Sequence, residues 1–253
     1  MFARRISLSL IFVSLWLSAA CGGRESPEID TRGSAEVVAM ERLAEKGQEI
    51  FRDRDFGETG VACIDCHADF DEDRNPDGRI RPGHSILGAH ARAHAWNGEF
   101  TGAALRHTGA GAAKCAWQFQ ERGAGIETAL SEEEAAALIA FYEYISPDEQ
   151  IPMLNWTAVT WPGDPDFEKE TFEQALAPIE KLRGDQQRGE RVYDMACASC
   201  HDHGIAPAKR ILKRKVDRLP AVVRAGEDGM PFFSRNKLSD QDIADVKAFV
   251  ARQ

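Results

Sequence analysis

The sequence of 253 residues lacks the features of several common protein classes. It has no excess of basic residues, because 31 Lys and Arg stand against 41 Asp and Glu, for a net charge of −10. Such a chain is a poor general binder of nucleic acid, whose phosphates require clustered Lys and Arg. Beyond residues 6–17 there is no further long apolar run, so we predict that the mature chain does not span a membrane. The proportions of hydrophobic (43%) and charged (28%) residues are ordinary, which leaves a globular chain of one large or two small domains.

The first 20 residues have the pattern of a bacterial export signal. Arg4 and Arg5 precede an apolar stretch of about a dozen residues, which is too short to span a membrane comfortably. The segment Leu17-Ser-Ala-Ala-Cys21 resembles the bacterial lipoprotein signal, which implies that Cys21 is lipidated and becomes the new N-terminus. Ordinary signal cleavage after Ala20 is the alternative. We expect a polar tether over residues 21–35 and a location on the periplasmic side of the cell envelope, held by a lipid anchor.

Four of the six cysteines lie in two CxxCH motifs, which are Cys63-Ile-Asp-Cys66-His67 and Cys197-Ala-Ser-Cys200-His201. Two thiols one helical turn apart can each add to one vinyl group of a porphyrin, and the next residue, a histidine, then faces the iron. The sequence has no other CxxC pair to complete a zinc site. We therefore predict two covalently bound haem c groups and no disulfide. The chain resembles the dihaem class of c-type cytochromes.

The sequence around the two motifs repeats. A segment with a glycine, followed one turn later by an apolar-aromatic pair, precedes each motif, and a helix that opens with Leu-Ser and acidic residues follows it. These segments are residues 46–51 and 188–193 before the motifs and residues 130–145 and 238–250 after them. Ser131 and Ser239 are expected N-caps. This order resembles class I cytochrome c domains, in which the glycine lets the first and last helices cross closely.

We therefore predict an all-α fold with two cytochrome c-like haem domains, over residues 36–146 and 185–253. An extended linker that contains Pro and Trp joins them over residues 147–184. A short helix is expected within this linker, over residues 167–182.

The second domain has a candidate for the other axial iron ligand. Met230 is followed by Pro231 shortly before the last helix, and this pair resembles the distal loop of cytochrome c. A thioether ligand favours ferrous iron and raises the reduction potential. His201 and Met230 are thus the expected axial ligands of haem 2.

The first domain has no methionine in the corresponding place, so its second axial ligand beside His67 stays open. The unpaired Cys115 lies upstream of the last helix of this domain. The N-terminal half resembles thiosulfate dehydrogenases and the dihaem subunit of the thiosulfate-oxidising complex, in which a cysteine in this stretch ligates the haem as thiolate. An arginine that those families often have four residues earlier is absent, and Gly111 stands there. The alternatives to Cys115 are, first, His84 and His107, and then His90, His94 and Met153. Arg106 and Arg122 are the candidates to replace the missing arginine.

The charged residues after the two motifs differ in sign. Acidic residues follow the first motif and basic residues follow the second, which suggests that the two faces attract partners of opposite charge. Asp73, Asn75, Asp77 and Gly78 match the start of a calcium-binding loop, but His84 stands where the loop needs a bidentate carboxylate. A solvated acidic turn is therefore favoured over calcium.

The leading functional hypothesis is an electron carrier that works with redox partner proteins. With a thiolate at haem 1 and a methionine at haem 2, haem 1 has the lower expected potential, so electrons would pass from haem 1 to haem 2. The alternative is an enzyme that oxidises thiosulfate or a related sulfur anion at haem 1, with Cys115 in the active site. We assign no catalytic residue under the leading hypothesis.

Overall fold

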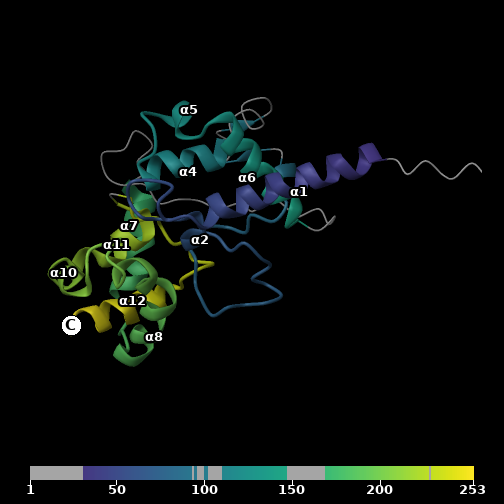
Figure 1. Cartoon of the computed structure of the whole chain (residues 1–253). Coiled ribbons are helices and arrows are strands. Elements are labelled where there is room, and N and C mark those ends of the chain that lie inside the picture. Colours follow the sequence, from purple (N-terminus) through teal and green to yellow (C-terminus); the bar gives the residue numbers. More distant parts are fainter. Residues whose placement is uncertain (1–30, 93, 96–99, 102–109, 147–168, 228) are drawn as a thin grey trace, which may run out of the picture.

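The fold is built from helices, as the sequence pattern predicts. The computed structural model describes residues 31–92, 94–95, 100–101, 110–146, 169–227 and 229–253 (Figure 1). The helices of the first half are α1 (Thr31–Arg52), α2 (Cys63–Cys66), η1 (Ala89–Ala91), α4 (Ala110–Gln120), α5 (Ile126–Ala129) and α6 (Glu132–Tyr144). Those of the second half are α7 (Lys169–Glu180), α8 (Gln186–Ala196), α9 (Ala198–His201), α10 (Lys209–Arg214), η3 (Val216–Arg218), α11 (Leu219–Ala225) and α12 (Asp240–Val250). Two short strands, β1 (His94–Ala95) and β2 (Phe100–Thr101), pair antiparallel.

The first core forms where α1 crosses α6. A Cβ atom on Gly47 would lie 2.0 Å from the carbonyl oxygen of Ala137, so only glycine allows the two backbones to approach this closely. One turn further along each helix, the rings of Phe51 and Phe141 pack with centroids 5.4 Å apart and planes inclined by 53°. Both rings are fully buried.

The second core repeats this crossing between α8 and α12. A Cβ atom on Gly189 would lie 2.0 Å from the carbonyl oxygen of Asp245. One turn further, the rings of Tyr193 and Phe249 pack with centroids 5.4 Å apart and planes inclined by 54°. The close helix crossing expected from the repeated glycine is therefore present twice, with nearly the same geometry.

Two serines begin the helices on which these glycines pack. Ser131 Oγ accepts the N–H of Glu134 at 3.2 Å, and Ser239 Oγ accepts the N–H of Asp242 at 3.1 Å. The acidic side chain accepts a hydrogen bond from the serine N–H in both cases, which completes a capping box. The predicted N-caps are confirmed, because a Ser followed three residues later by an acid satisfies the first backbone donors of a helix locally.

Two helices bear on the expected domain limits. Helix α1 begins at Thr31, so it extends into the segment expected to be a tether. The predicted helix in the linker is present as α7, but Ala175 and Ile179 of this helix are buried, and Ile179 belongs to the second core. This helix therefore packs on the second domain. Residues 147–168, the rest of the expected linker, lie outside the described residues, as do the expected signal and Cys21.

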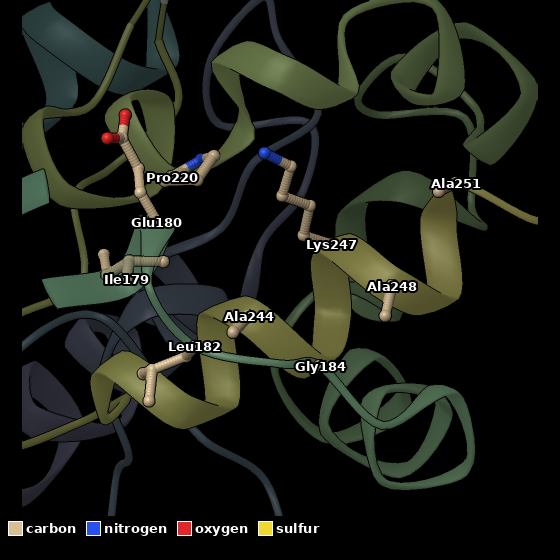
Figure 2. Close-up of a pocket in the computed structure, with 9 residues that line it drawn as sticks. All are labelled: Ile179, Glu180, Leu182, Gly184, Pro220, Ala244, Lys247, Ala248 and Ala251. Carbon is tan, nitrogen blue, oxygen red and sulfur yellow. The ribbon is translucent and has the colours of Figure 1, made fainter. Parts of the chain in front are cut away.

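A shallow groove of about 270 Å³ lies beside α12 (Figure 2). Its lining comes from α7 and the residues after it, α11, and α12 and the residue that follows it: Ile179, Glu180, Leu182, Gly184, Pro220, Ala244, Lys247, Ala248 and Ala251. No residue of either CxxCH motif lines it.

Among the described residues, no helix has both the length and the apolar character needed to cross a membrane.

Asp245, which Gly189 contacts, also anchors α8 through its side chain. Its carboxylate is buried and accepts hydrogen bonds from Arg188 Nε at 2.8 Å and from the N–H of Asp185 at 2.6 Å. Burial is the largest single influence and raises the pKa of Asp245, but the hydrogen bonds from Arg188, Asp185 and Gln241 together lower it below the ordinary value. The charged form of this side chain therefore stabilises the fold.

We expect Asp245→Asn to make the free energy of unfolding depend less on pH in the acid range. Because the folded-state pKa is depressed, the contribution of Asp245 is present above its unfolded pKa of about 3.9 and is lost as pH falls through the folded value. In urea unfolding, the free energy of unfolding should differ between wild type and variant at pH 7, and this difference should narrow towards pH 3. Glu190→Gln, at an exposed position of α8, is the control and should keep the wild-type profile. A difference that stays constant with pH would contradict this account.

Candidate haem-attachment sites

The first CxxCH motif forms the single turn of α2. The N–H of His67 donates to the carbonyl oxygen of Cys63 at 2.9 Å, and the carboxylate of Asp65 accepts the N–H of Ala62 at 3.0 Å. The His67 ring is oriented by a 2.6 Å hydrogen bond from Nδ1 to the carbonyl oxygen of His84. Because a carbonyl oxygen only accepts, Nδ1 carries the proton and Nε2 keeps a free lone pair, which is the form of histidine that binds a metal.

The second motif has the same arrangement in α9. The N–H of His201 donates to the carbonyl oxygen of Cys197 at 3.0 Å, and the ring Nδ1 donates to the carbonyl oxygen of Pro207 at 2.7 Å. In His201, as in His67, Nε2 is the ring nitrogen that would bind a metal. Two histidines that are far apart in the sequence are thus prepared in the same way for a metal.

Glycine packing helps to fix the His67 ring of the first motif. A Cβ atom on Gly83 would lie 2.4 Å from Cε1 of His67, and the N–H of Gly83 donates to the carbonyl oxygen of Cys66 at 2.8 Å. The chain therefore holds the His67 ring against backbone without a side chain in between. Burial is the main cause that lowers the pKa of His67, which favours the neutral imidazole that a metal requires.

The motif cysteines are half-buried. Desolvation is the main cause that raises the pKa of Cys63 to about 12, raises that of Cys66 well above its ordinary value, and raises that of Cys197 to about 12. The pKa of Cys200 is also raised, mainly by burial. Protonated thiols at this spacing, each motif followed by an oriented histidine, fit the covalent attachment of haem c.

Cys115 lies on α4, near the first motif. Its thiol is close enough to Cys63 that the charge of Cys63 raises the pKa of Cys115, although burial is the larger cause of a value of about 12. The Tyr142 side chain of α6 is close to both of these thiols, and its pKa is raised well above its ordinary value, mainly by burial. The fold therefore brings Cys115 to the first attachment site across about 50 residues of sequence.

The other candidates for the haem 1 ligand are placed differently. The carbonyl oxygen of His84 contacts Nδ1 of His67, so this residue lies at the ring edge that faces away from Nε2. His90 is exposed in η1, and His94 is described only as part of β1. His107 and Met153 lie outside the described residues, as does Arg106. Arg122 is engaged elsewhere, because it pairs with Glu134 at 2.7 Å and stacks over the ring of Phe56.

Met230 lies on the same core as the second motif. It is partly buried and packs against the cluster that also contacts Cys197. Two backbone hydrogen bonds with Glu227, of 2.8 and 3.2 Å, close the turn that presents it. A Cβ atom on Gly226 would lie 2.8 Å from the carbonyl oxygen of Met230, and the φ of Gly226 is +75°, so this turn requires glycine. The loop thus fixes the backbone of Met230 next to the core of the second domain.

Several acidic residues after the first motif are paired with arginines. Asp69 pairs with Arg52, and both oxygens of Asp77 accept from Arg81, at 3.1 and 2.7 Å. The hydrogen bond from Arg81 is the main cause that lowers the pKa of Asp77 to about 2. In the part of the chain that the structure describes, no group of three or more His, Cys, Asp or Glu side chains is arranged to hold a metal ion.

Sequence reasoning missed the groups that orient the site. The carbonyl oxygens of His84 and Pro207 hold the two histidine rings, and Arg81 organises the acidic loop. A proline soon after the second motif was a usable signal, because Pro restricts the backbone and its carbonyl oxygen remains free to accept. No local pattern distinguishes Arg81 from the other arginines of its loop.

Comparison with known proteins gives matches to haem proteins. The family model described as cytochrome c oxidase, cbb3-type, subunit III matches residues 184–250. Cytochrome c6 of Cyanidioschyzon merolae is 35% identical over 80 residues, which are 27% of this chain and 75% of that protein. Cytochrome c6 of Bumilleriopsis filiformis is 35% identical over 80 residues, 27% of this chain and 92% of that protein. A cytochrome c6-like protein of Nostoc sp. is 30% identical over 76 residues, 26% of this chain and 68% of that protein. No solved structure gives a significant match.

Proposed function

Because the chain belongs to the c-type cytochromes, we propose that it is a dihaem electron carrier of the bacterial cell envelope. It would carry electrons from the first attachment site to the second and on to a redox partner protein. The lipoprotein-like segment that ends at Cys21 supports an anchored location on the periplasmic side.

The observation that carries this proposal is the repeated histidine geometry. His67 and His201 each follow a CxxC turn, and each donates Nδ1–H to a downstream carbonyl oxygen. The residues that would hold the two haem groups covalently are Cys63, Cys66, Cys197 and Cys200. When bound, haem c supplies an iron that takes up and releases one electron.

For the remaining axial ligands we propose Met230 in the second domain and Cys115 in the first. Met230 is fixed by its turn beside the second core. Cys115 is favoured over His84 because Cys115 lies near the Cys63 thiol, whereas His84 contacts the far edge of the His67 ring.

A basic face near the second motif suits an acidic redox partner. Lys209 is held over the Tyr193 ring at 4.5 Å and pairs with Asp202 at 2.9 Å, so α10 starts next to the motif. The exposed basic residues that follow are Arg210, Lys213, Arg214, Lys215 and Arg218. A positive face on a chain of net charge −10 gives a direction to docking.

We expect two haem groups per chain in protein matured in the bacterial periplasm. The pyridine haemochrome spectrum, divided by protein concentration, should give two for wild type. It should give one for the double variant Cys63→Ala/Cys66→Ala and one for Cys197→Ala/Cys200→Ala, because each pair of thiols holds its own group. Cys115→Ala is the control and should keep both, since this thiol forms no thioether. A wild-type value of one would refute the dihaem proposal.

The second candidate function is oxidation of thiosulfate or a related sulfur anion at the first site. The position of Cys115 beside Cys63 favours it, while the engagement of Arg122 with Glu134 speaks against an anion site built on that arginine. An assay with thiosulfate and ferricyanide separates the two functions, and absence of turnover in wild type removes the enzyme hypothesis.

A further inference from the structure

Two consecutive residues of one loop contact the first CxxCH motif and the helix that leads into the second. Arg81 Nε–H donates to the carbonyl oxygen of Ile64, in the middle of the first motif, at 3.2 Å. The N–H of Ile80 donates to the carbonyl oxygen of Met195 at 2.9 Å, two residues before the second motif. These hydrogen bonds therefore link the first motif to the end of α8 through residues 80 and 81.

The Arg81 side chain is fixed in a single orientation. It is only 2% exposed and pairs with Glu72 and with Asp77, whose nearer contact is 2.7 Å. A guanidinium group can satisfy two carboxylates and a carbonyl oxygen at once because its donors point in a fixed planar fork. An ammonium group has no such fork, so lysine cannot reproduce all of these contacts.

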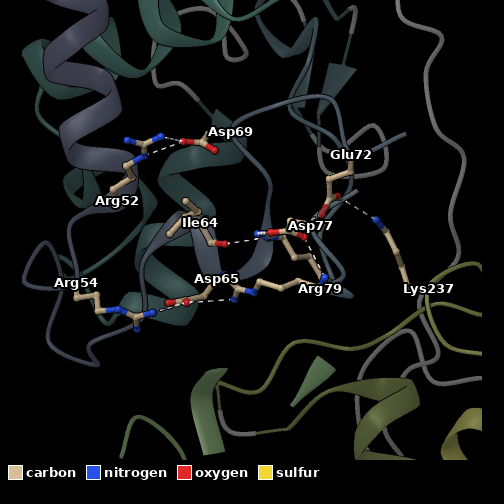
Figure 3. Close-up of polar contacts among 10 residues, drawn as sticks. Arg52, Arg54, Ile64, Asp65, Asp69, Glu72, Asp77, Arg79 and Lys237 are labelled. Carbon is tan, nitrogen blue, oxygen red and sulfur yellow. Dashed lines mark hydrogen bonds and ion pairs between the residues drawn. The ribbon is translucent and has the colours of Figure 1, made fainter. Parts of the chain in front are cut away.

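Arg79, at the start of the same segment, reaches the other middle residue of the first motif. Its guanidinium lies 3.7 Å from Asp65, whose carboxylate is fully buried and also pairs with Arg54 at 2.6 Å. Figure 3 shows Arg79 and Arg54 approaching Asp65 from two sides. Residues 79 and 81 thus hold both residues that stand between Cys63 and Cys66.

The opposite side of the segment contacts the second domain. Ile80 packs against the core that contains Val192 and Tyr193 of α8, the helix that leads into the second motif. Lys237, from the loop before α12, lies 3.9 Å from Glu72, the carboxylate that Arg81 also binds (Figure 3). The segment therefore lies between the two domains and forms a hydrogen bond with each.

We propose that residues 79–81 form a fixed spacer between the two attachment sites, and that Arg81 is the positioning residue that sets their separation and relative orientation. This inference rests on the proposed function, because it requires haem at both motifs. The hydrogen bonds of Arg81 to Ile64 and of Ile80 to Met195 bring the first motif close to the helix that leads into the second. Because electron tunnelling weakens steeply with distance, a spacer at this contact controls the exchange of electrons between the two sites.

Circular dichroism in the Soret region of the haem-loaded protein tests the spacer. Two haem groups held close together in a fixed orientation give a couplet of opposite signs, which depends on their geometry and not on turnover. We expect Arg81→Lys to lose most of the couplet while retaining two haem groups per chain. Ile80→Ala removes an apolar contact with the second core but no charge, and it should weaken the couplet as well. Arg74→Lys is the matched control, since Arg74 is an exposed arginine of the same loop, and should keep the couplet.

The outcomes separate the spacer from the proposed function. A wild-type protein with one haem per chain overturns the dihaem function on which the spacer depends. Two haem groups without a couplet in wild type, or a couplet that survives unchanged in both Arg81→Lys and Ile80→Ala, overturns the spacer and leaves the dihaem function standing. If Arg81→Lys does not fold, Ile80→Ala decides the question by itself.

Discussion

Replacing Gly189 with alanine should lower the free energy of unfolding by about 1–3 kcal/mol, the usual range for overpacking a tight contact. The added Cβ would lie 2.0 Å from the carbonyl oxygen of Asp245 and 2.5 Å from its carbonyl carbon, both of which are backbone atoms of α12. The helices must therefore separate, which also disturbs the packing of Tyr193 on Phe249. At an ordinary position inside a helix, glycine to alanine raises stability by roughly 0.5–1 kcal/mol, so the expected effect has the opposite sign.

Urea unfolding followed by far-ultraviolet circular dichroism measures this effect. Glu190→Ala is the matched control, because Glu190 is the next residue of α8 and is exposed, and its effect should stay within about 0.5 kcal/mol. Gly47→Ala should behave like Gly189→Ala, since its Cβ would lie 2.0 Å from the carbonyl oxygen of Ala137. A Gly189→Ala variant as stable as wild type would show that the two helices can separate freely, contrary to the close crossing described above.

Replacing Cys115 with alanine should abolish the low-spin EPR signal of the first haem in the oxidised, haem-loaded protein. The fold places this thiol near Cys63, and a thiol that coordinates a metal gives up its proton even where burial is the main cause that raises its pKa to about 12. The signal of the second haem should be unchanged, because its proposed ligands are His201 and Met230.

His84→Ala is the matched comparison for the Cys115 variant. It removes the imidazole but keeps the backbone carbonyl oxygen that orients His67, so the signal of the first haem should persist. If the signal is unchanged in Cys115→Ala and lost in His84→Ala, the thiolate assignment is wrong and a histidine ligand takes its place.

Much of the framework could be predicted because it depends on short spacings. Each CxxCH motif is complete within five residues, and each capping box within four. The turns of α2 and α9 and the starts of α6 and α12 therefore follow from local chemistry. The repeated glycines also predicted the close helix crossings. A Cβ atom at either glycine would lie 2.0 Å from a carbonyl oxygen of the facing helix, so only a residue without a side chain fits there.

The sequence suggested a place for Cys115 beside the first motif but could not establish it. About 50 residues separate Cys115 from Cys63, and no periodic pattern connects the two. The sequence also left open, for a related reason, which domain α7 joins. Composition identified a helix there, but only the packing of Ile179 into the second core shows which domain it joins.

The covalent chemistry of this protein was therefore set by its local sequence, whereas the arrangement of its two sites was decided by the tertiary fold. The carbonyl oxygen that orients His67 comes from 17 residues away, and the hydrogen bond of Ile80 reaches the carbonyl oxygen of Met195 in the other half of the chain. Such contacts join groups whose spacing obeys no helical or strand period. The contacts of Arg81 could not be predicted either, because several arginines carry the same charge. Burial selects Arg81, because two carboxylates and a carbonyl oxygen converge on its guanidinium group, an arrangement that no other arginine among the described residues has.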